Sequence, residues 1–336
     1  MKKPSSSRTS KLANRLILLL SLLLAGLFLF LALRGLDWVT FIQILQNGDY
    51  KYLPLIFILS SLAYLIRALR WTTFLSAGKK LSLNDVFWAN MVGYLGNAYL
   101  PARAGEVLRS VFLGSKSRLG TSFVLATALA ERLLDVIALV LIGTTCLLWQ
   151  NGNRISPELV IAIWTMAFFS VAGLIVMIAA PFQEKLILSF IIWLPLPPKI
   201  ATFLSEQTSR FLVGMRSLQD WHRLIKFILL TGAIWLTDAF GTTVGVRIIS
   251  QIISIEQALI LLSALGLSSA IPSTPGFVGV YQFIAIIVMT PFGFSRADAL
   301  AYIIIAQLLN YIVVSFWGVL GLWQINRSKQ SLNIEA

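Results

Sequence analysis

Residues 101–109 read Pro-Ala-Arg-Ala-Gly-Glu-Val-Leu-Arg, and this charged stretch interrupts a chain that is otherwise largely apolar. Proline and glycine end or bend helices, and a charge placed in hydrocarbon costs roughly 2.5–3.5 kcal/mol on insertion scales. A second charged group, Glu131, Arg132 and Asp135, follows inside the next apolar run. We therefore expect both groups to line a polar route within a membrane.

The composition is that of an all-α polytopic membrane protein. Hydrophobic residues make up 57% of the 336 positions and charged residues 12%, whereas a soluble domain carries about 25% charged residues. We expect one integral membrane domain over residues 1–336. Cys146 and His222 are the only cysteine and histidine, which excludes disulfides, Cys/His metal sites and histidine base chemistry within the membrane. No metal and no cofactor are expected.

The apolar runs predict about six full spans and two broken, re-entrant hairpins. A span needs about 20 apolar residues. The first run follows a basic segment but is long and lacks a small-residue cleavage site, so we expect a retained helix rather than a signal peptide. The six runs of spanning length are 16–33, 52–69, 120–149, 158–180, 225–249 and 299–324, and the two broken runs are 86–101 and 257–292.

The basic residues predict the orientation. With the N-terminus in the cytoplasm, 21 of the 27 Lys and Arg fall in cytoplasmic segments and five in external ones, as the positive-inside rule requires. This explains the net charge of +13 without nucleic acid. Residues 1–15 and 326–336 become cytoplasmic tails around a membrane domain, 16–325. We interpret 181–224 as an amphipathic stretch on the cytoplasmic surface, with a short re-entrant element as the alternative.

The two broken runs share a pattern. Each has a short apolar half-helix that breaks at proline, reaches a glycine, and lies between two long helices. In the expected topology, the first broken run is open to the cytoplasmic side of the membrane and the second to the external side. This is the arrangement of an inverted repeat whose site lies near the midplane of the membrane. Two kinked helices without symmetry are the alternative. The helix breaks that this interpretation assigns are Pro101, Gly105, Pro272, Pro275, Gly276 and Gly279.

The charges of the first broken run suit a phosphodiester. Arg103, Glu106 and Arg109 are spaced by three, so they share one face if the chain is helical there. Two arginines around one glutamate leave surplus positive charge, and guanidinium groups bind phosphate oxygens in bidentate fashion. Arg67 and Arg70, at the expected cytoplasmic end of the run 52–69, add further positive charge on the same side. The positive-inside rule alone also explains these two residues.

Glu131, Arg132 and Asp135 lie within an apolar helix and should point inward toward partners. Glu131 and Asp135 are four residues apart on one face, and Arg132 can pair with Asp135. One interpretation is a structural ion-pair network, and the other is a cavity wall that exchanges partners with Arg103, Arg109 or a headgroup. Asp238 lies mid-span without an obvious local partner. Further polar residues in the apolar runs are Gln282, Gln307 and Asn310, of which the last two are interpreted as interhelical hydrogen-bonding residues.

Three motifs in order resemble the flippase-like membrane family, which includes the transmembrane region of lysylphosphatidylglycerol synthases and stand-alone UPF0104 proteins. They are Pro-x-Arg-x-Gly-Glu-x-x-Arg at 101–109, Glu-Arg-x-x-Asp at 131–135, and Pro-x-x-Pro-Gly-x-x-Gly at 272–279. The resemblance covers roughly residues 12–325. It implies a prokaryotic inner-membrane protein that moves phospholipids or polyprenyl-linked lipids between leaflets. The family often has an acidic residue where this chain has Gln282. These 336 residues include no segment resembling the soluble synthase domain, so aminoacylation is not expected of them.

The functional prediction is a flippase or scramblase-like transporter whose partners are lipids with anionic or phosphate-bearing headgroups. No Gly-x-x-x-x-Gly-Lys-Ser/Thr loop is present, so transport would be passive or driven by an ion gradient. One alternative is a membrane subunit that serves a separately encoded lipid synthase or glycosyltransferase. The other is an intramembrane, carboxylate-based lipid transferase. Residues that could carry protons are Glu106, Glu131, Asp135 and Asp238.

Overall fold

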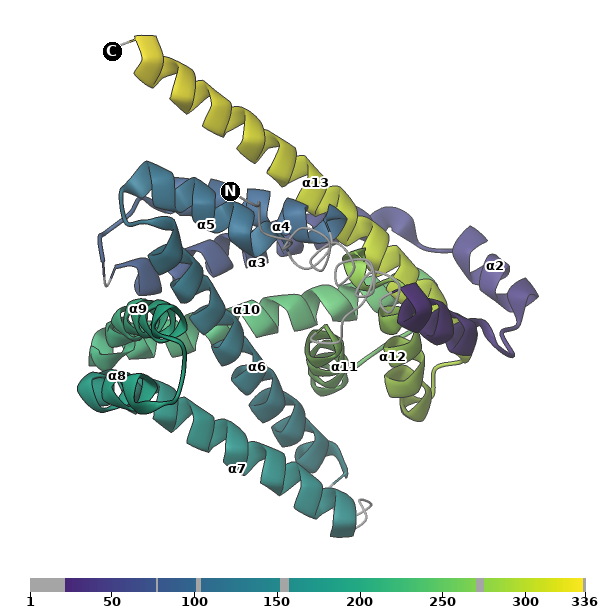
Figure 1. The fold of residues 1–336 in the computed structure, drawn as a ribbon. Coiled ribbons are helices and arrows are strands. Elements are labelled where there is room, and N and C mark those ends of the chain that lie inside the picture. The colour runs from purple at the N-terminus through teal and green to yellow at the C-terminus, as the bar shows by residue number, and fades with distance from the viewer. Residues whose placement is uncertain (1–21, 77, 101–103, 152–156, 270–274, 335–336) are drawn as a thin grey trace, which may run out of the picture.

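The computed structural model describes residues 22–76, 78–100, 104–151, 157–269 and 275–334, and this part of the chain is helical with no strand (Figure 1). A long diagonal helix, α13, runs across one end, and α6, α7 and α10 cross below it (Figure 1). The helices are Leu22–Leu33, α2 (Trp38–Gln46), α3 (Leu53–Leu75), α4 (Leu83–Tyr99), α5 (Ala104–Ser117), α6 (Thr121–Asn151), α7 (Pro157–Ala179), α8 (Glu184–Trp193), α9 (Pro198–Met215), α10 (Trp221–Val246), α11 (Ile255–Ser268), α12 (Val280–Met289) and α13 (Arg296–Ile334). Short 3₁₀ turns, η1 (Tyr50–Tyr52), η3 (Ala180–Gln183), η4 (Arg216–Gln219), η5 (Arg247–Ile249), η6 (Pro275–Phe277) and η7 (Thr290–Phe292), join some of them.

Four helical stretches of the described chain are long and apolar enough to cross a membrane, which makes this a multi-pass membrane protein. They are Tyr50–Leu75, Trp164–Trp193, Trp221–Ile249 and Arg296–Arg327. The helix Leu22–Leu33 and α2 together pass the same test as a fifth, but they are bent by 91°. The expected count of six full spans stays a prediction.

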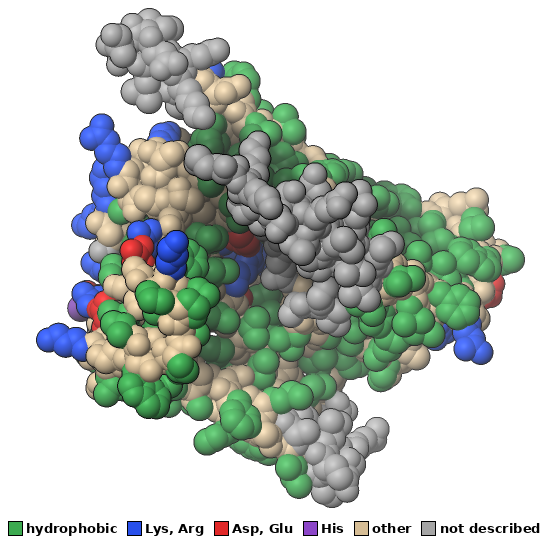
Figure 2. Space-filling view, in the orientation of Figure 1, with side chains coloured by type: hydrophobic (Ala, Val, Ile, Leu, Met, Phe, Trp, Pro, Cys, Tyr) green, Lys and Arg blue, Asp and Glu red, His purple; other side chains and the backbone are tan. Residues whose placement is uncertain are grey.

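The outer surface is suited to lipid. Phe168 and Phe169 of α7 are each 68% exposed, and green hydrophobic side chains cover much of the face in Figure 2. Because water is absent from the bilayer core, a spanning helix satisfies its own backbone and presents apolar side chains outward. Exposed aromatic and aliphatic side chains are therefore the expected outer face of this fold.

The region 181–224 folds as two short helices, α8 and α9, that contact each other. Glu184 at the start of α8 accepts a hydrogen bond from Ser209 Oγ of α9 at 2.8 Å and also pairs with Arg216. Phe190 and Trp193 of α8 are exposed. The interpretation of 181–224 as an amphipathic stretch on the cytoplasmic surface stays a prediction. The apolar run that begins in α7 continues through α8, beyond the expected span end at residue 180.

Each broken run folds as a helix–break–helix element. α4 and α5 pack against each other, as do α11 and α12. Next to the first break, the backbone of α5 at Gly105 lies directly against the backbone of α4 at Gly93. The contact is so close that a Cβ added to Gly105 would lie 1.9 Å from the carbonyl oxygen of Gly93. At the second, Gly276 and Gly279 have positive φ angles of 70° and 89°, a conformation that glycine adopts without strain. Pro101 and Pro272 lie outside the described residues.

The glycine contact predicts a large loss of stability on adding one methyl group. In Gly105→Ala the new Cβ would overlap backbone atoms, which cannot rotate away, so we expect α4 and α5 to separate at a cost of about 1–3 kcal/mol or more. Gly232→Ala in α10 is the matched control, because nothing lies within 4 Å of its Cβ position. Thermal unfolding of the purified protein in detergent measures both. Equal midpoints for the two variants would show that the α4–α5 contact is looser than described.

The helix contacts follow a twofold pattern. α3 packs on α10, while α4 packs on α13 and α11 packs on α6. Suppose that the two halves are exchanged, so that α3, α4 and α6 take the places of α10, α11 and α13. The α3–α10 contact is then unchanged, and the α4–α13 and α6–α11 contacts replace each other. The crossings of α4 with α13 and of α6 with α11 both use glycine, at Gly318 against Leu95 and at Gly143 against Ser263.

The two long helices at the centre run in opposite directions. Phe74 near the end of α3 stacks edge-on with Phe227 near the start of α10. At the other end, Ile56 near the start of α3 lies 3.8 Å from the Cβ position of Gly245 near the end of α10. Since α3 and α10 are equivalent under the exchange of halves and are antiparallel, this central pair has the form expected of an inverted repeat.

Candidate functional site

Arg70 of α3 is the centre of a buried ionic cluster. Its Nη1 donates to Asp135 Oδ1 at 2.6 Å, and its Nη2 donates to Asp135 Oδ2 at 3.0 Å and to Glu131 Oε1 at 3.0 Å. Nη1 also donates to the Thr231 hydroxyl of α10 at 3.2 Å. Glu131 and Asp135 are one helical turn apart on α6 and face the same arginine, as their spacing predicts.

Arg109 of α5 continues the cluster on the other side of Glu131. Its Nη1 lies 3.4 Å from Glu131 Oε2 and donates to Asn90 Oδ1 at 2.7 Å. Its Nη2 pairs with Glu106, three residues earlier on the same helix. Thus Glu131 is shared between two arginines that come from different helices.

Arg132 closes the cluster into a ring. Its Nε donates to Glu106 Oε1 at 2.9 Å, and its Nη1 lies 3.9 Å from Asp135 Oδ2. Three arginines and three acids therefore alternate, and the group as a whole carries no net charge. In order, the ion-pair ring is Arg70, Glu131, Arg109, Glu106, Arg132 and Asp135.

A separate ion pair lies beside the ring. Arg67 Nη2 of α3 donates to Asp238 Oδ2 of α10 at 2.5 Å. The sequence shows no local partner for Asp238, and the structure supplies one from 171 positions away. Both side chains are partly exposed, at 17% and 19%.

The ring has a buried side and an accessible side. The side chains of Arg70, Arg109 and Glu131 are at most 3% exposed, whereas that of Arg132 is 32% exposed. Figure 2 shows acidic and basic side chains recessed near the middle of a mainly hydrophobic face. Arg132 is therefore the member that a molecule outside the ring can reach.

Aromatic rings and amides complete the site, and the sequence interpretation does not assign them. Arg109 lies 4.5 Å from the centre of the Trp71 ring, and Arg132 lies 5.8 Å from that of Tyr94. Such contacts stabilise a cation where water is scarce. Asn90 and Asn97 of α4 turn toward the arginine and the glutamate of α5. Their spacing of seven on one face of an apolar half-helix is the signal that would have identified them.

Several buried polar atoms around the ring make no hydrogen bond within the described residues. Such a buried atom costs about 1–3 kcal/mol when it is left without a partner. A polar recess of this kind is suited to water, which bridges buried donors and acceptors in membrane and soluble proteins alike. The atoms are Arg70 Nε, Arg109 Nε, Asn90 Nδ2 and Asn97 Oδ1, together with Arg109 Nη2 and Glu106 Oε2, whose contact with each other is an ion pair.

The second broken element has a neutral counterpart of the ring. Gln282 Oε1 accepts from the backbone N–H of Gly279 at 2.7 Å, and Gln282 Nε2 donates to Gln307 Oε1 at 2.5 Å. Gln307 Nε2 then donates to the carbonyl of Gly276 at 3.0 Å. Asn310 accepts from the Tyr64 hydroxyl at 2.6 Å. Gln307 and Asn310 thus make the interhelical hydrogen bonds that the sequence interpretation gives them.

The structure brings together most of the expected site residues. Arg109, one of the two arginines in the expected surplus of positive charge, is paired with Glu106 and Glu131. The other, Arg103, lies outside the described residues, so the surplus itself stays a prediction. Within the described chain, no group of three or more His, Cys, Asp or Glu side chains is placed to hold a metal ion.

Comparison with known proteins gives a consistent result. The family model described as "Lysylphosphatidylglycerol synthase TM region" matches residues 18–318. A UPF0104 membrane protein of Pyrococcus horikoshii is 24% identical over 295 residues, which cover 82% of this chain and 88% of that protein. A second, of Methanocaldococcus jannaschii, is 23% identical over 334 residues, covering 91% and 95%. No solved structure matches.

Proposed function

This chain belongs to the family of lysylphosphatidylglycerol synthase transmembrane regions, and on that premise we propose that it moves lipid headgroups between membrane leaflets. The observation that carries the proposal is the ion-pair ring, whose only well-exposed member is an arginine. In this proposal the protein lies in the cell membrane of a prokaryote with both termini in the cytoplasm, as the basic residues favour.

The ring lowers the barrier that a headgroup meets in hydrocarbon. That barrier arises because a charged group loses its hydration on entering an apolar medium. Fixed guanidinium groups and bridging water replace the lost hydration, while the acyl chains stay in the bilayer against the apolar outer surface. The neutral ring attracts no permanent counterion, so a phosphate group must displace a carboxylate to bind.

The weakest connection of the ring marks the place of entry. Arg132 Nη1 and Asp135 Oδ2 are 3.9 Å apart, beyond hydrogen-bond distance, whereas every other link is 3.4 Å or shorter. A phosphate oxygen that approaches Arg132 replaces this loose contact and leaves Asp135 on Arg70. The headgroup is then held by charge-assisted hydrogen bonds, which are about twice as strong as neutral ones.

Reconstitution tests the proposal directly. The full chain is placed in liposomes that contain a trace of phosphatidylglycerol with a fluorescent headgroup, and a membrane-impermeant reductant bleaches the outer leaflet. Without flipping, about half of the fluorescence remains. If the protein moves lipid, the protected half is also bleached, at a rate that rises with the amount of protein. No acceleration over protein-free liposomes, with correctly folded protein, would contradict the proposal.

The same preparation separates transport from lipid chemistry. After incubation, the lipids are extracted and analysed for new headgroups. Transport leaves their composition unchanged, whereas an intramembrane transferase produces a modified lipid. A subunit that only serves a separate synthase or glycosyltransferase would, on its own, neither speed the bleaching of the protected lipid nor produce a modified lipid.

A further inference from the structure

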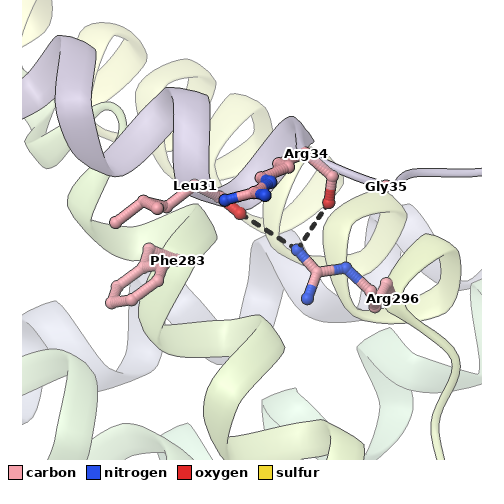
Figure 3. Close-up of a pocket in the computed structure, with 5 residues that line it drawn as sticks. All are labelled: Leu31, Arg34, Gly35, Phe283 and Arg296. Carbon is pink, nitrogen blue, oxygen red and sulfur yellow. Dashed lines mark hydrogen bonds between the residues drawn. The ribbon is translucent and has the colours of Figure 1, made fainter.

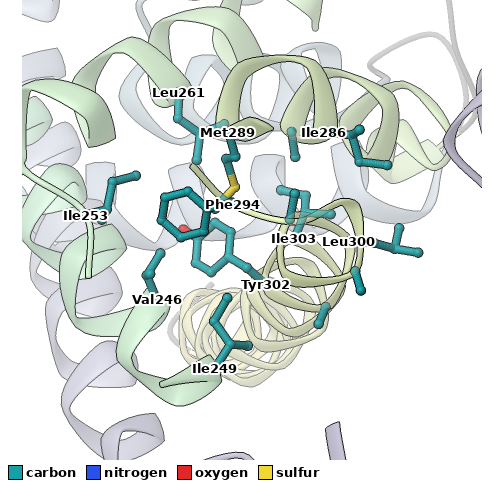
Figure 4. Close-up of a cluster of buried hydrophobic side chains, with 14 of the residues drawn as sticks. Val246, Ile249, Ile253, Leu261, Ile286, Met289, Phe294, Leu300, Tyr302 and Ile303 are labelled. Atoms are coloured by element: carbon teal, nitrogen blue, oxygen red, sulfur yellow. The ribbon is translucent and has the colours of Figure 1, made fainter. Parts of the chain in front are cut away.

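A second charged recess lies away from the ring, at the junction of the first helix, α12 and α13. It is an open recess at the surface, with a volume of about 490 Å³. None of its lining residues belongs to the ion-pair ring. They are Leu31, Arg34, Gly35, Phe283 and Arg296 (Figure 3).

The two arginines of this recess lack acidic partners. Within the described residues, no carboxylate oxygen lies within 4.0 Å of the guanidinium group of Arg34 or Arg296. The acids nearest in sequence, Asp37 and Asp298, are engaged elsewhere, because each accepts hydrogen bonds at the start of a helix. This differs from the ring, where every arginine is balanced by a carboxylate.

Arg296 is held firmly, and Arg34 is not. Arg296 Nη2 donates to the carbonyl oxygens of Leu31 and Arg34, each at 3.0 Å, at the C-terminal end of the first helix (Figure 3). Its buried Nε makes no hydrogen bond within the described chain. The Arg34 side chain is exposed and likewise makes none in that part of the chain. One guanidinium is thus preorganised, and the other is available to a ligand.

We propose that Arg34 and Arg296 form an anion site that takes a phosphate group, carried either by a lipid or by a small phosphate ester. Two guanidinium groups without acidic partners beside one recess match the several oxygens of a phosphate. Leu31 and Phe283 give the recess an apolar wall, which suits an organic phosphate. The site does not depend on the proposed transport function, because none of its residues belongs to the ring.

Binding by purified full-length protein in an uncharged detergent tests this site. Calorimetric titrations use three probes: dihexanoyl phosphatidylglycerol, glycerophosphoglycerol and inorganic phosphate. Arg34→Gln removes the available guanidinium, and we expect it to weaken binding about tenfold or more. Arg247→Gln is the matched control, since Arg247 is also an exposed arginine on the expected external side but does not line the recess. That control should bind as the wild type does.

The probes separate the two sources of phosphate. Tighter binding of the short-chain lipid than of glycerophosphoglycerol identifies a lipid headgroup as the ligand, whereas equal binding of the two identifies a soluble phosphate compound. If no probe binds at millimolar concentrations, or if both variants weaken binding equally, the site is refuted.

A second measurement keeps the test decisive if Arg34→Gln folds poorly. Phenylglyoxal modifies accessible arginine side chains in the wild-type protein, and mass spectrometry locates the modified residues. A bound phosphate compound should protect Arg34 and leave the modification of Arg247 unchanged. Equal modification of Arg34 with and without the probes would overturn the proposal.

Discussion

Arg70→Met is expected to destabilise the protein by about 3–5 kcal/mol, because it removes the common partner of two carboxylates in a buried network. Arg70 is 1% exposed and contacts both Glu131 and Asp135. Methionine fills much of the space of the arginine stem but leaves Asp135 with only the loose contact to Arg132. The free energy of unfolding, measured by denaturant titration in mixed micelles, should fall accordingly.

Two further variants make this result specific to the ring. Arg210→Met removes an exposed pair with Glu206 at 3.8 Å and should cost at most about 0.5 kcal/mol, as such surface pairs do. Adding Asp135→Asn to Arg70→Met removes the stranded charge and should restore part of the stability. If Arg70→Met were no less stable than Arg210→Met, the buried pairs would not hold the helices together.

Arg132→Gln is expected to slow lipid movement by about tenfold or more while leaving the protein folded. On the proposed mechanism Arg132 is the first group that a headgroup meets, and losing a hydrogen bond between charged groups removes about 1.5–3 kcal/mol, where 1.36 kcal/mol corresponds to a factor of ten in rate. The side chain is 32% exposed, so its loss disturbs packing much less than the loss of Arg70. The liposome bleaching rate measures the effect.

The conservative variant separates binding from simple charge. Arg132→Lys keeps the positive charge but lacks the planar fork of donors, so we expect an intermediate rate. Arg210→Gln removes an exposed arginine of α9 whose ion pair is with Glu206 and not with the ring, and this variant should transport at the wild-type rate. A wild-type rate for Arg132→Gln would remove Arg132 from the mechanism, even if the protein moves lipid.

Much of the fold follows from the sequence. Long apolar runs predict helices near 52–69, 225–249 and 299–324, and the corresponding helices α3, α10 and α13 include these ranges or most of them. The helices extend beyond the apolar runs, as α3 does to Leu75 and α13 to Ile334, because backbone hydrogen bonding continues through polar residues that the hydrophobic pattern does not count.

The candidate site was only partly predictable. The sequence identifies the charged residues that lie in apolar runs, because each is costly there and must find a partner. It also gives the local pair of Arg132 with Asp135 and places Glu106 and Arg109 on one face, because residues three apart on a helix are neighbours. It did not assign Asn90 and Asn97, although their spacing of seven was an available signal. It gives no sign of the aromatic rings, whose presence in a membrane helix is ordinary.

The sequence by itself determined the class of this protein, the position of its helices and the residues that carry charge into the membrane, because hydrophobicity and local spacing are properties of the chain. Only the tertiary structure decided which charges meet. Arg67 finds Asp238, and Arg70 finds Glu131, across separations of 171 and 61 residues. Such pairings depend on how antiparallel helices cross, and the same packing joins three arginines and three acids from α3, α5 and α6 into a neutral ring in which Arg132 is the most exposed member.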